Sequence, residues 1–536
     1  MRRFKLLTLA LILIAARSAE AAPRLGVLVV FDQLPAWLLA RADPFFGSGG
    51  FGGLDGAHYV ASYPYASTET GPGHATLSTC SLPNVHGITG NSWFAERTRR
   101  YAVEDAAFPV LGASGTPPPG RSAVALLAPT LGDTLRIESS GRARVVAFSH
   151  KDRAAILSAG KSANLAVWYD PAQGRYTTST AYADALPPWL AELGQTLPAS
   201  AMRDGRWSPL PTPKGLAPLL PEDNRPGEGA MEGAGPTFPH DLTSAPEGRR
   251  RALYRLSPQS VTDLFALALR AVDEMKLGAD AVPDLLVVSV STTDVVGHNY
   301  GPESLEALDM LRRSDLALRD FVAQLKKRLG ADALIVAVTS DHGAPTLPQT
   351  ADAVSLPTPA LTVPDVVDAA NAAIRGVLAA RPPSGDRTLG FFPPHLFLDL
   401  DGLGPSEQER VLVAVKKAIE RLAGVAQVYR TDSPEQDGFT ALMMAAAAPG
   451  RRGQLLVRTA PRVVVLSERT PRLGTDHGSA YLYDRRVPFL LSGPGVKAGK
   501  YASPVDPRDV APSLAFLLGI APPDLCEGRP VSAVGD

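Results

Sequence analysis

The sequence predicts an α/β fold in which a doubly wound, mostly parallel sheet carries helices on both faces. Two observations support this prediction. Short apolar runs rich in β-branched residues recur along the chain, as expected for strands buried on both faces, and helical patterns lie between them. The chain has 536 residues, 45% of them hydrophobic and 20% charged, which suits one large core with insertions.

Five apolar runs are predicted to be strands of this sheet. They are Leu25–Phe31, Arg144–Phe148, Leu285–Val290, Leu334–Val338 and Val487–Leu491. The first four lead into ionisable residues, among them Asp32, Lys151, Asp294 and Asp341. Because doubly wound sheets bind ligands beyond the carboxyl ends of their strands, these residues predict a polar site at one edge of the sheet.

Two long helices are predicted between the strands. Val261–Leu277 is amphipathic, and Ser260 with Asp263 resembles a capping box at its start. Glu303–Leu329 ends in basic residues and is followed by Gly330, a pattern typical of a helix C-terminus.

Two regions are predicted to interrupt the core, which would comprise residues 22–344 and 471–536. Residues 206–250 are rich in Pro and Gly and predict an irregular excursion rather than a domain. Residues 345–470 separate two strands and predict a small inserted α+β cap with a βαβ-like pattern. Its elements are a strand at His395–Leu400, a helix at Ser406–Leu422 and a strand at Val425–Arg430.

Residues 1–21 are interpreted as a secretory signal peptide that is removed on export. Basic residues precede the apolar run Leu6–Ala16, and Ala19-Glu20-Ala21 fits a cleavage site. The alternative is a membrane anchor, but this run is too short to cross a hydrocarbon layer about 30 Å thick. We therefore expect a periplasmic or secreted protein with no stable membrane anchor after cleavage.

Charge and cysteine content exclude some classes of function. A formal net charge of −1 argues against a protein that binds a nucleic acid duplex by neutralising phosphates. Cys80 and Cys526 are the only cysteines, so there is no Cys-x-x-Cys zinc site, and the sequence leaves open whether the two pair. A metal site in this chain must use histidines and carboxylates.

Three carboxylates and three imidazoles follow or lie near the predicted strand ends. They are Asp32, Asp294, His298, Asp341, His342 and His477. Two zinc ions with three protein ligands each need six such groups. The i,i+4 spacing of Asp294 and His298 puts both on one face of a helical turn. Each pair alone is common on protein surfaces, and only the combination in this order points to a two-metal centre.

Two further segments carry groups suited to phosphate chemistry. Ser67-Thr-Glu-Thr-Gly-Pro-Gly-His74 precedes the helical-looking Ala75–Ser78, so a hydroxyl there can act as a nucleophile at a helix N-terminus, the alternative being a simple helix cap. Lys151 and Arg153 alternate along what reads as an extended segment, so both can face the oxygens of a phosphoryl group. Solvated surface charge is the alternative for this pair.

Seven motifs in a fixed order give this chain a family resemblance. They are Val30-Phe-Asp-Gln33, Thr70-Gly-Pro-Gly-His74, His86-Gly-Ile-Thr-Gly-Asn91, Lys151-Asp-Arg153, Asp294 with His298, Asp341-His-Gly343, and His477-Gly478. The chain resembles the alkaline phosphatase superfamily, and within it the phosphate-irrepressible alkaline phosphatases with a threonine nucleophile (PafA type). The match runs over most of the mature chain and is loose in the insertions.

The resemblance implies a role for each of these residues. One zinc ion would be held by Asp294, His298 and His477. The other would be held by Asp32, Asp341 and His342 together with the oxygen of Thr70. The non-bridging oxygens of the phosphate would be contacted by Asn91, Lys151 and Arg153. The hydroxyls of Ser67 and Thr68 are alternative nucleophiles, and Thr70 is preferred because it directly precedes Gly-Pro-Gly. Asp476 receives no role.

The implied activity is hydrolysis of small phosphate monoesters through a phosphothreonine intermediate, by an enzyme that we expect to be a monomer. Lys151 and Arg153 favour monoesters, because a monoester dianion carries more charge on its non-bridging oxygens than a diester does. A nucleotide pyrophosphatase/phosphodiesterase is the alternative within the superfamily. A sulfatase is excluded because Cys80 is not followed by the required Pro and Arg spacing. A binding protein that lost its chemistry is disfavoured because all six ligands are present.

Overall fold

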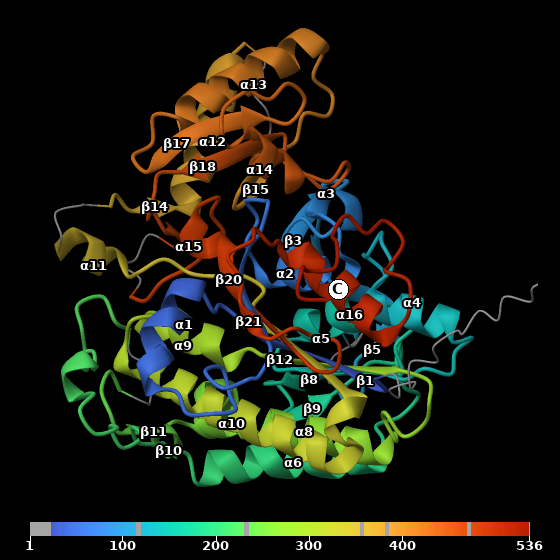
Figure 1. Ribbon diagram of the computed structural model, residues 1–536. Coiled ribbons are helices and arrows are strands. Elements are labelled where there is room, and N and C mark those ends of the chain that lie inside the picture. The colour runs from blue at the N-terminus through green and yellow to red at the C-terminus, as the bar shows by residue number, and fades with distance from the viewer. Residues whose placement is uncertain are drawn as a thin grey trace, which may run out of the picture.

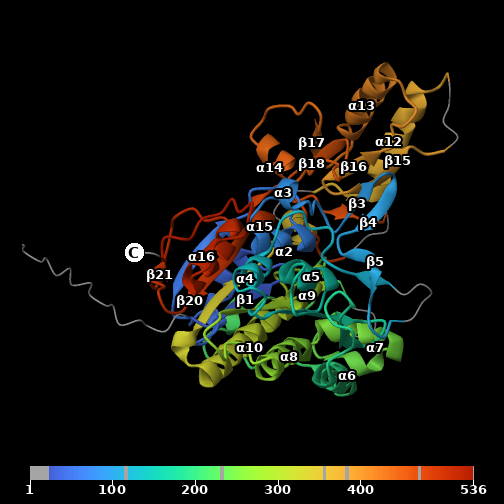
Figure 2. The same cartoon turned by 90° about the vertical axis from the view of Figure 1, so that its right-hand side faces the viewer.

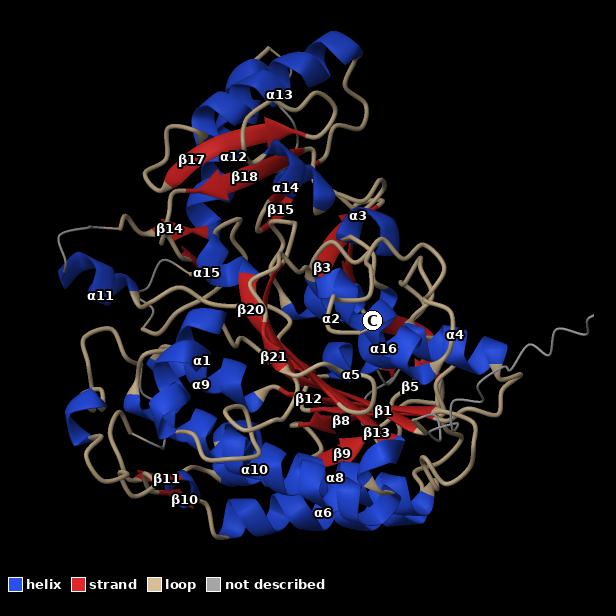
Figure 3. Cartoon of the chain, viewed as in Figure 1, coloured by secondary structure: helices blue, strands red, loops and turns tan. Residues whose placement is uncertain are grey.

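A computed structural model describes residues 23–113, 119–229, 235–353, 358–380, 385–468 and 473–534. The predicted signal peptide lies outside these residues. The chain forms a central nine-stranded sheet between two layers of helices, with a smaller sheet of its own in the insertion (Figures 1 and 3). Among the described residues, none of the helices combines the length and the hydrophobicity needed to cross a bilayer.

The main sheet has the order β21-β2-β20-β13-β1-β12-β7-β8-β9. Its strands are β1 (Leu25–Phe31), β2 (Ala57–Ser62), β7 (Val145–Ser149), β8 (Leu165–Asp170), β9 (Arg175–Thr177), β12 (Asp284–Val290), β13 (Leu334–Thr339), β20 (Arg486–Ser492) and β21 (Gly499–Lys500). The five central strands β13, β1, β12, β7 and β8 run parallel, and β20 runs antiparallel to β13. The predicted mostly parallel α/β sheet is therefore confirmed.

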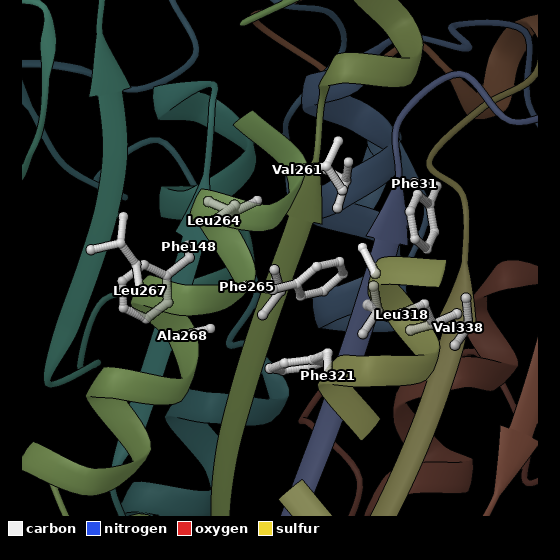
Figure 4. Close-up of a cluster of buried hydrophobic side chains, with 14 of the residues drawn as sticks. Phe31, Phe148, Val261, Leu264, Phe265, Leu267, Ala268, Leu318, Phe321 and Val338 are labelled. Atoms are coloured by element: carbon white, nitrogen blue, oxygen red, sulfur yellow. The ribbon is translucent and has the colours of Figure 1, made fainter. Parts of the chain in front are cut away.

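Alternate residues of the central strands face opposite helical layers. Val27, Val29 and Phe31 of β1 pack in one hydrophobic cluster, whereas Leu28 and Val30 pack in another. The first layer consists of α6 (Pro188–Arg203), α8 (Pro258–Glu274) and α10 (Leu305–Leu329), and Figure 4 shows α8 and α10 covering this face of the sheet. The second layer consists of α2 (Thr70–Thr79), α4 (Leu131–Glu138), α5 (Asp152–Ala159) and α16 (Val510–Leu518). Burial on both faces explains the unbroken apolar runs of the sequence.

The two long predicted helices are present, with one change at a boundary. Helix α8 begins at Pro258, and its N-cap is Ser257, whose hydroxyl accepts from the amide of Ser260. The predicted capping box of Ser260 and Asp263 is therefore wrong, because proline at the first helical position starts the helix one turn earlier. Helix α10 ends at Leu329, and Gly330, with φ +86°, is its C-cap, as predicted.

The insertion has a four-stranded sheet of order β15-β16-β18-β17. The strands are β15 (Thr388–Phe392), β16 (His395–Leu398), β17 (Val425–Arg430) and β18 (Leu455–Thr459), and the helices are α12 (Val363–Val377), α13 (Pro405–Ile419) and α14 (Thr440–Ala445). Both β16 and β17 pair antiparallel with β18, so they run parallel to each other on either side of it. The predicted βαβ pattern is thus a split βαβ motif, in which β18 lies between β16 and β17.

The insertion stands at one end of the molecule, next to the hairpin of β3 (Ser92–Ala95) and β4 (Thr98–Tyr101) (Figure 2). Phe94 of the hairpin stacks on Phe392, with ring centroids 5.6 Å apart. Arg451 donates to the carbonyl oxygens of Gly87 and Ala125 at 2.9 and 2.6 Å. These contacts place the insertion against the segment that leads to Asn91.

The remaining elements are short. They are α1 (Ala36–Ala42), α3 (Pro83–His86), β5 (Glu104–Pro109), β6 (Gly120–Arg121), β10 (Arg206–Trp207), β11 (His240–Asp241), α7 (Glu247–Leu253), α9 (Thr292–Tyr300), α11 (Pro348–Ala353), β14 (Leu361–Thr362), β19 (Val465–Leu466) and α15 (Leu482–Arg485). The described part of residues 206–250 contains β10, β11, two turns of 3-10 helix and the start of α7. Cys80 and Cys526 form a disulfide.

Candidate active site

Four parallel strands bring their polar residues to one edge of the sheet. Asp32 follows β1, Lys151 follows β7, and Asp341 lies two residues beyond β13. Asp294 lies in the first turn of α9, directly after β12. The register of these strands aligns their carboxyl ends, since Phe31 pairs with Val290. Side chains that are far apart in the sequence therefore converge at this edge.

His477 reaches the same edge by a different route. It lies before β20, and because β20 is antiparallel to β13, its start faces the carboxyl ends of the parallel strands. The ring nitrogen Nδ1 of His477 donates to the carbonyl oxygen of Thr68 at 2.7 Å. The third predicted histidine is thus fixed against the segment that carries the candidate nucleophile.

The first group of candidate metal ligands is Asp294, His298 and His477. Oδ1 of Asp294 lies 3.1 Å from Nε2 of His298 and 3.6 Å from Nε2 of His477. One ligand atom from each residue lies within 4.8 Å of the others. Two ligands about 2.0–2.1 Å from one tetrahedral zinc ion are about 3.4 Å apart, so this spacing fits zinc.

The second group centres on His342. Its Nε2 lies 3.4 Å from Oδ1 of Asp32 and 3.6 Å from Oδ2 of Asp341. Ligand atoms of Asp294, Asp32 and His342 also lie within 4.8 Å of one another, so the carboxylate of Asp294 lies between the two groups. Oδ1 of Asp32, Oδ2 of Asp341 and Nε2 of His342 are buried and make no hydrogen bond. Buried polar atoms without partners are costly, and a cation bound among them would satisfy all three.

Each candidate histidine ligand has its other ring nitrogen fixed by a backbone carbonyl. Nδ1 of His298 donates to Thr475, at 2.8 Å, and Nδ1 of His342 donates to Gly343, at 3.0 Å. Since a carbonyl can only accept, the proton must sit on Nδ1, which leaves the lone pair of Nε2 directed at the carboxylates. This is the arrangement by which proteins orient histidine for a metal.

Electrostatics at this edge are dominated by the buried carboxylates. Burial opposes the charge of Asp294, but His298 and then Lys151 outweigh it and hold the pKa of this carboxyl well below its usual range. Burial also opposes the charge of His342, yet Asp341 and Asp32 raise its pKa to about 9. By contrast, burial and the neighbouring His342 lower the pKa of His477. The lowered pKa of Asp294 keeps this carboxylate ionised, and its negative charge favours a cation beside it.

Thr70 is the first residue of α2, and its hydroxyl faces the cations. Its Oγ1 lies 3.2 Å from Nζ of Lys151 and 3.3 Å from Nη2 of Arg153. The two alternative hydroxyls point elsewhere, because Ser67 donates to the carbonyl of Thr89 and Thr68 to that of Ser479. Helix α2 approaches the loop after β13 so closely that a Cβ on Gly73 would lie 2.3 Å from the carbonyl oxygen of Asp341.

Lys151 and Arg153 converge on Thr70, but only Lys151 has the extended backbone that the sequence predicts for both. Lys151 is the N-cap of α5, and Arg153 lies in its first turn. The run of Ala and Leu that follows favours a helix here, so the two side chains meet at a helix N-terminus. Nζ of Lys151 also lies 2.7 Å from Asp32 and 2.6 Å from Asp294. Lys151 therefore connects both carboxylate groups to the hydroxyl of Thr70.

Asn91 is held beside Thr70 by a pair of hydrogen bonds. Its side-chain Oδ1 accepts from the backbone N–H of Gly71 at 2.8 Å. The backbone N–H of Asn91 donates to Oε2 of Glu69 at 2.6 Å. Since Gly71 N–H needs an acceptor, the amide oxygen of Asn91 is fixed there and its Nδ2 is the free donor group. Burial raises the pKa of Glu69 although the bond to Asn91 opposes this.

Sequence reasoning gave no role to three residues that contact the predicted site. Gln33 donates to Oδ1 of Asp341 from its backbone and to Oδ1 of Asp294 from its side chain, at 3.1 and 3.2 Å. It does so from a left-handed backbone, φ +59°, which no sequence pattern announces. His74 lies 3.2 Å from Oδ2 of Asp341. Glu69 is the third residue, and only its position directly before Thr70 in the sequence could have indicated that it contacts the site.

Comparisons with known proteins identify the family. A sequence model of the type I phosphodiesterase / nucleotide pyrophosphatase family matches residues 27–480. The chain is 29% identical to alkaline phosphatase PafA of Elizabethkingia meningoseptica, over 97% of this chain and 96% of that protein. It is 30% identical to alkaline phosphatase PhoV of Synechococcus elongatus, over 96% of this chain and 93% of that protein.

Solved structures give the same result. The crystal structure of wild-type PafA matches with a TM-score of 0.88 at 28% identity, covering 96% of this chain and 99% of that one. Murine ectonucleotide pyrophosphatase / phosphodiesterase 5 matches with a TM-score of 0.50 at 14% identity, which is a likeness of fold alone. The resemblance recognised in the sequence motifs is thus confirmed, and the chain belongs to the type I phosphodiesterase / nucleotide pyrophosphatase family of the alkaline phosphatase superfamily.

Proposed function

We propose that this protein is an exported alkaline phosphatase that hydrolyses small phosphate monoesters, with Thr70 as nucleophile and two zinc ions as cofactors. The observation that supports this most directly is the position of the Thr70 hydroxyl, 3.2 Å from Lys151 Nζ and 3.3 Å from Arg153 Nη2, at the edge where six candidate metal ligands meet. Relatives over the whole chain are named alkaline phosphatases.

The ligand sets follow the two groups of the site. Asp294, His298 and His477 would hold one zinc ion. The other would be held by Asp32, Asp341 and His342, with the oxygen of Thr70. Bound zinc supplies Lewis acidity, which lowers the pKa of a coordinated hydroxyl or water and neutralises charge on a leaving oxygen. Mixed histidine and carboxylate ligation favours zinc over manganese.

In the proposed reaction, Oγ1 of Thr70 attacks phosphorus in line with the bond to the leaving alcohol. That bond breaks, the alcohol departs, and a phosphothreonine forms at Thr70. Lys151, Arg153 and Nδ2 of Asn91 bind the non-bridging oxygens, where they balance the charge of the transferring phosphoryl group. A water molecule then attacks the phosphothreonine from the opposite side, which releases phosphate and restores the hydroxyl of Thr70.

The preference for monoesters is argued from charge. Lys151 and Arg153 are two cations directed at the same hydroxyl, and a monoester dianion offers them more negative charge than a diester does. The alternative is a diesterase of the nucleotide pyrophosphatase/phosphodiesterase type, favoured by the description of the matching family. A diesterase must also accommodate a second organic group beside the phosphate.

The organisation of the chain fits the same proposal. We propose that residues 22–344 and 471–536 form the catalytic core and that residues 345–470 form a cap. The cap contacts the segment before Asn91 through Arg451 and the hairpin after Asn91 through Phe392, so it can influence access to the site. A disulfide between Cys80 and Cys526 suits an oxidising compartment, which supports export to the periplasm or medium. The proposed enzyme acts as a monomer.

A kinetic panel on the mature protein tests the activity. We expect p-nitrophenyl phosphate to be hydrolysed at least about a hundredfold more efficiently than its bis ester, with no measurable sulfate ester hydrolysis. Equal or reversed efficiencies for the first two substrates would overturn the monoesterase proposal in favour of the diesterase. The double variant Lys151→Ala/Arg153→Ala should lose monoesterase activity far more than any diesterase activity, because it removes the cations that recognise the dianion.

A further inference from the structure

A cavity of about 280 Å³ opens beside the two cations that face Thr70. It is lined by Lys151 and Arg153 at one side and by residues at the carboxyl ends of β7 and β8 at the other, including Trp168 and Tyr169. Its volume is at the small end of the range of ligand pockets, about 300–1,000 Å³. A short-chain organic group fits such a space, whereas a large one does not.

The cavity is lined by more cations than acids. Four basic residues line it, Arg121, Lys151, Arg153 and Arg255, against two acids, Asp152 and Asp170. Both acids already have partners. Asp152 accepts from Nε of Arg121 at 2.7 Å and from the hydroxyl of Tyr101. Asp170 accepts from the amide of Ala172 and from the side chain of Gln173, at 2.9 and 2.8 Å.

Three of the four basic residues also have hydrogen-bond or ion-pair partners. Arg121 pairs with Asp152, Lys151 lies between Asp32 and Asp294, and Arg153 contacts Thr70 and the hydroxyl of Tyr101. The exception is Arg255. Its guanidinium has no hydrogen bond or ion pair to any residue in the described ranges, and its Nε is buried without a partner.

An unpaired guanidinium in this position is costly. Burial and then the charge of Arg153 lower the pKa of Arg255, while Asp294 opposes this from a distance. Arginine nevertheless keeps its proton, so the positive charge remains in the cavity wall. Buried charges in folded proteins are normally paired or bind a ligand, which identifies this group as a site for an anion.

The position of Arg255 connects the cavity with the helix that carries two of the candidate metal ligands. Arg255 lies in the 3-10 helix Tyr254–Leu256, which packs against α9, the helix that carries Asp294 and His298. In the proposed reaction Thr70 attacks from the side of Asp32 and Asp341. In-line attack sends the leaving alcohol to the opposite side, and we assign the cavity lined by Lys151, Arg153 and Arg255 as the space that receives its organic group.

We propose that Arg255 binds a second anionic group, a carboxylate or phosphate, on the alcohol portion of the substrate. This inference rests on the proposed phosphomonoesterase function and specifies its substrate class as small phosphate monoesters with a second negative charge. Arg153 and Lys151 bind the scissile phosphate, and the forked guanidinium of Arg255 binds the distal anion with two parallel hydrogen bonds. The cavity between them holds the short carbon chain that links the two anions.

Matched substrate pairs test this proposal. Glycerol 3-phosphate and 3-phosphoglycerate differ by a distal carboxylate, and fructose 6-phosphate and fructose 1,6-bisphosphate differ by a distal phosphate. In the unmodified enzyme, we expect kcat/KM for at least one doubly charged member to exceed that of its partner by about tenfold or more, as for a charge-assisted hydrogen bond. Arg255→Gln should reduce this ratio to near unity, mainly by raising KM for the doubly charged substrate.

Two further variants serve as controls. Arg255→Lys keeps the charge without the fork and should retain part of the preference. Arg270→Gln removes an exposed arginine of α8 that pairs with Glu274, and it should leave every ratio unchanged. A ratio near unity in the unmodified enzyme, or an equal ratio in Arg255→Gln, would overturn the inference. Failure to hydrolyse any of the four substrates would instead contradict the proposed function, so the two failures are distinguishable.

Discussion

Nδ1 of His477 lies 2.7 Å from the backbone carbonyl oxygen of Thr68, a residue 409 positions earlier in the chain. This contact joins the segment before β20 to the segment that begins α2. It fixes the proton of His477 on Nδ1 and directs Nε2 towards Asp294, 3.6 Å away. A candidate metal ligand and the candidate nucleophile, Thr70, therefore share one structural support.

Removal of the Thr70 hydroxyl tests the nucleophile. We expect Thr70→Ala to lower kcat/KM for p-nitrophenyl phosphate by about a thousandfold or more, because no group remains to form the covalent intermediate. Thr70→Ser keeps an oxygen at the start of α2 and should retain a measurable fraction of the activity. Acid quenching with labelled substrate should trap phosphate on the protein only when residue 70 carries a hydroxyl. Activity of Thr70→Ala within tenfold of the unmodified enzyme would refute the assignment.

Glu69 is expected to act by positioning Asn91. Glu69→Ala removes the carboxylate that accepts from the backbone N–H of Asn91, 2.6 Å away. This change should lower kcat/KM by about tenfold to a hundredfold. Glu69→Gln offers an amide oxygen in the same place and should restore most of this loss. In a double-mutant cycle with Asn91→Ala, the two losses should not add, since both act through one contact. Additive losses would mean that Glu69 affects the site by another route.

Metal removal should abolish activity and lower stability together. Six candidate ligands line the site, and Asp32, Asp341 and His342 include buried atoms without hydrogen bonds. Chelation should therefore reduce the rate by at least about a hundredfold and lower the melting temperature, and added zinc should reverse both effects. Metal analysis of the purified protein should find about two equivalents of zinc, and fewer in His477→Ala. Full activity in protein shown to be free of metal would contradict this account.

Asp263 provides a pH test away from the site. Burial raises the pKa of this carboxyl to about 6, although hydrogen bonds from Tyr254 and Gln259 oppose the shift. Between its ordinary pKa and about 6, the folded state binds this proton more tightly than the unfolded state. The free energy of unfolding should therefore fall as pH rises through this window, by up to about 3 kcal/mol.

Asp263→Asn keeps the shape of the side chain and removes the ionisation. Between pH 4.5 and pH 7.5, the melting temperature of the unmodified protein should change less favourably than that of the variant. Melting temperatures of both proteins at the two pH values measure this difference. An exposed carboxyl such as Asp273, which pairs with Arg328 on the surface, supplies the control Asp273→Asn. If both variants show the same pH dependence as the unmodified protein, Asp263 is ionised in the folded state.

Much of the fold, and the convergence of the candidate site residues at one edge of the sheet, follow from the sequence alone. Runs such as Leu25–Phe31 and Leu334–Val338 are strands buried on both faces. Such strands appear in the sequence as continuous β-branched, apolar runs, so they can be predicted without knowing which strands they pair with. Polar residues directly after such runs, Asp32 and Asp341 among them, must then lie at the carboxyl edge of a parallel sheet. The i,i+4 spacing of Asp294 and His298 is equally local and is realised in α9.

Local signals were less reliable where two short-range preferences compete. The alternation of Lys151 and Arg153 resembles an extended segment, but the following Ala-rich run makes it the start of α5. Proline at position 258 likewise moved the start of α8 ahead of the predicted cap. In both cases the helix begins at a different residue from the one that the sequence pattern indicates.

Only the tertiary structure decided which distant groups meet. The antiparallel direction of β20 brings His477 to Thr68, and the left-handed backbone of Gln33 lets one residue contact both Asp294 and Asp341. The packing of Tyr254–Leu256 on α9 puts Arg255 in the wall of the cavity that Lys151 and Arg153 also line. Such contacts depend on strand order and chain reversal, which arise from the whole core, and no neighbouring residue in the sequence records them.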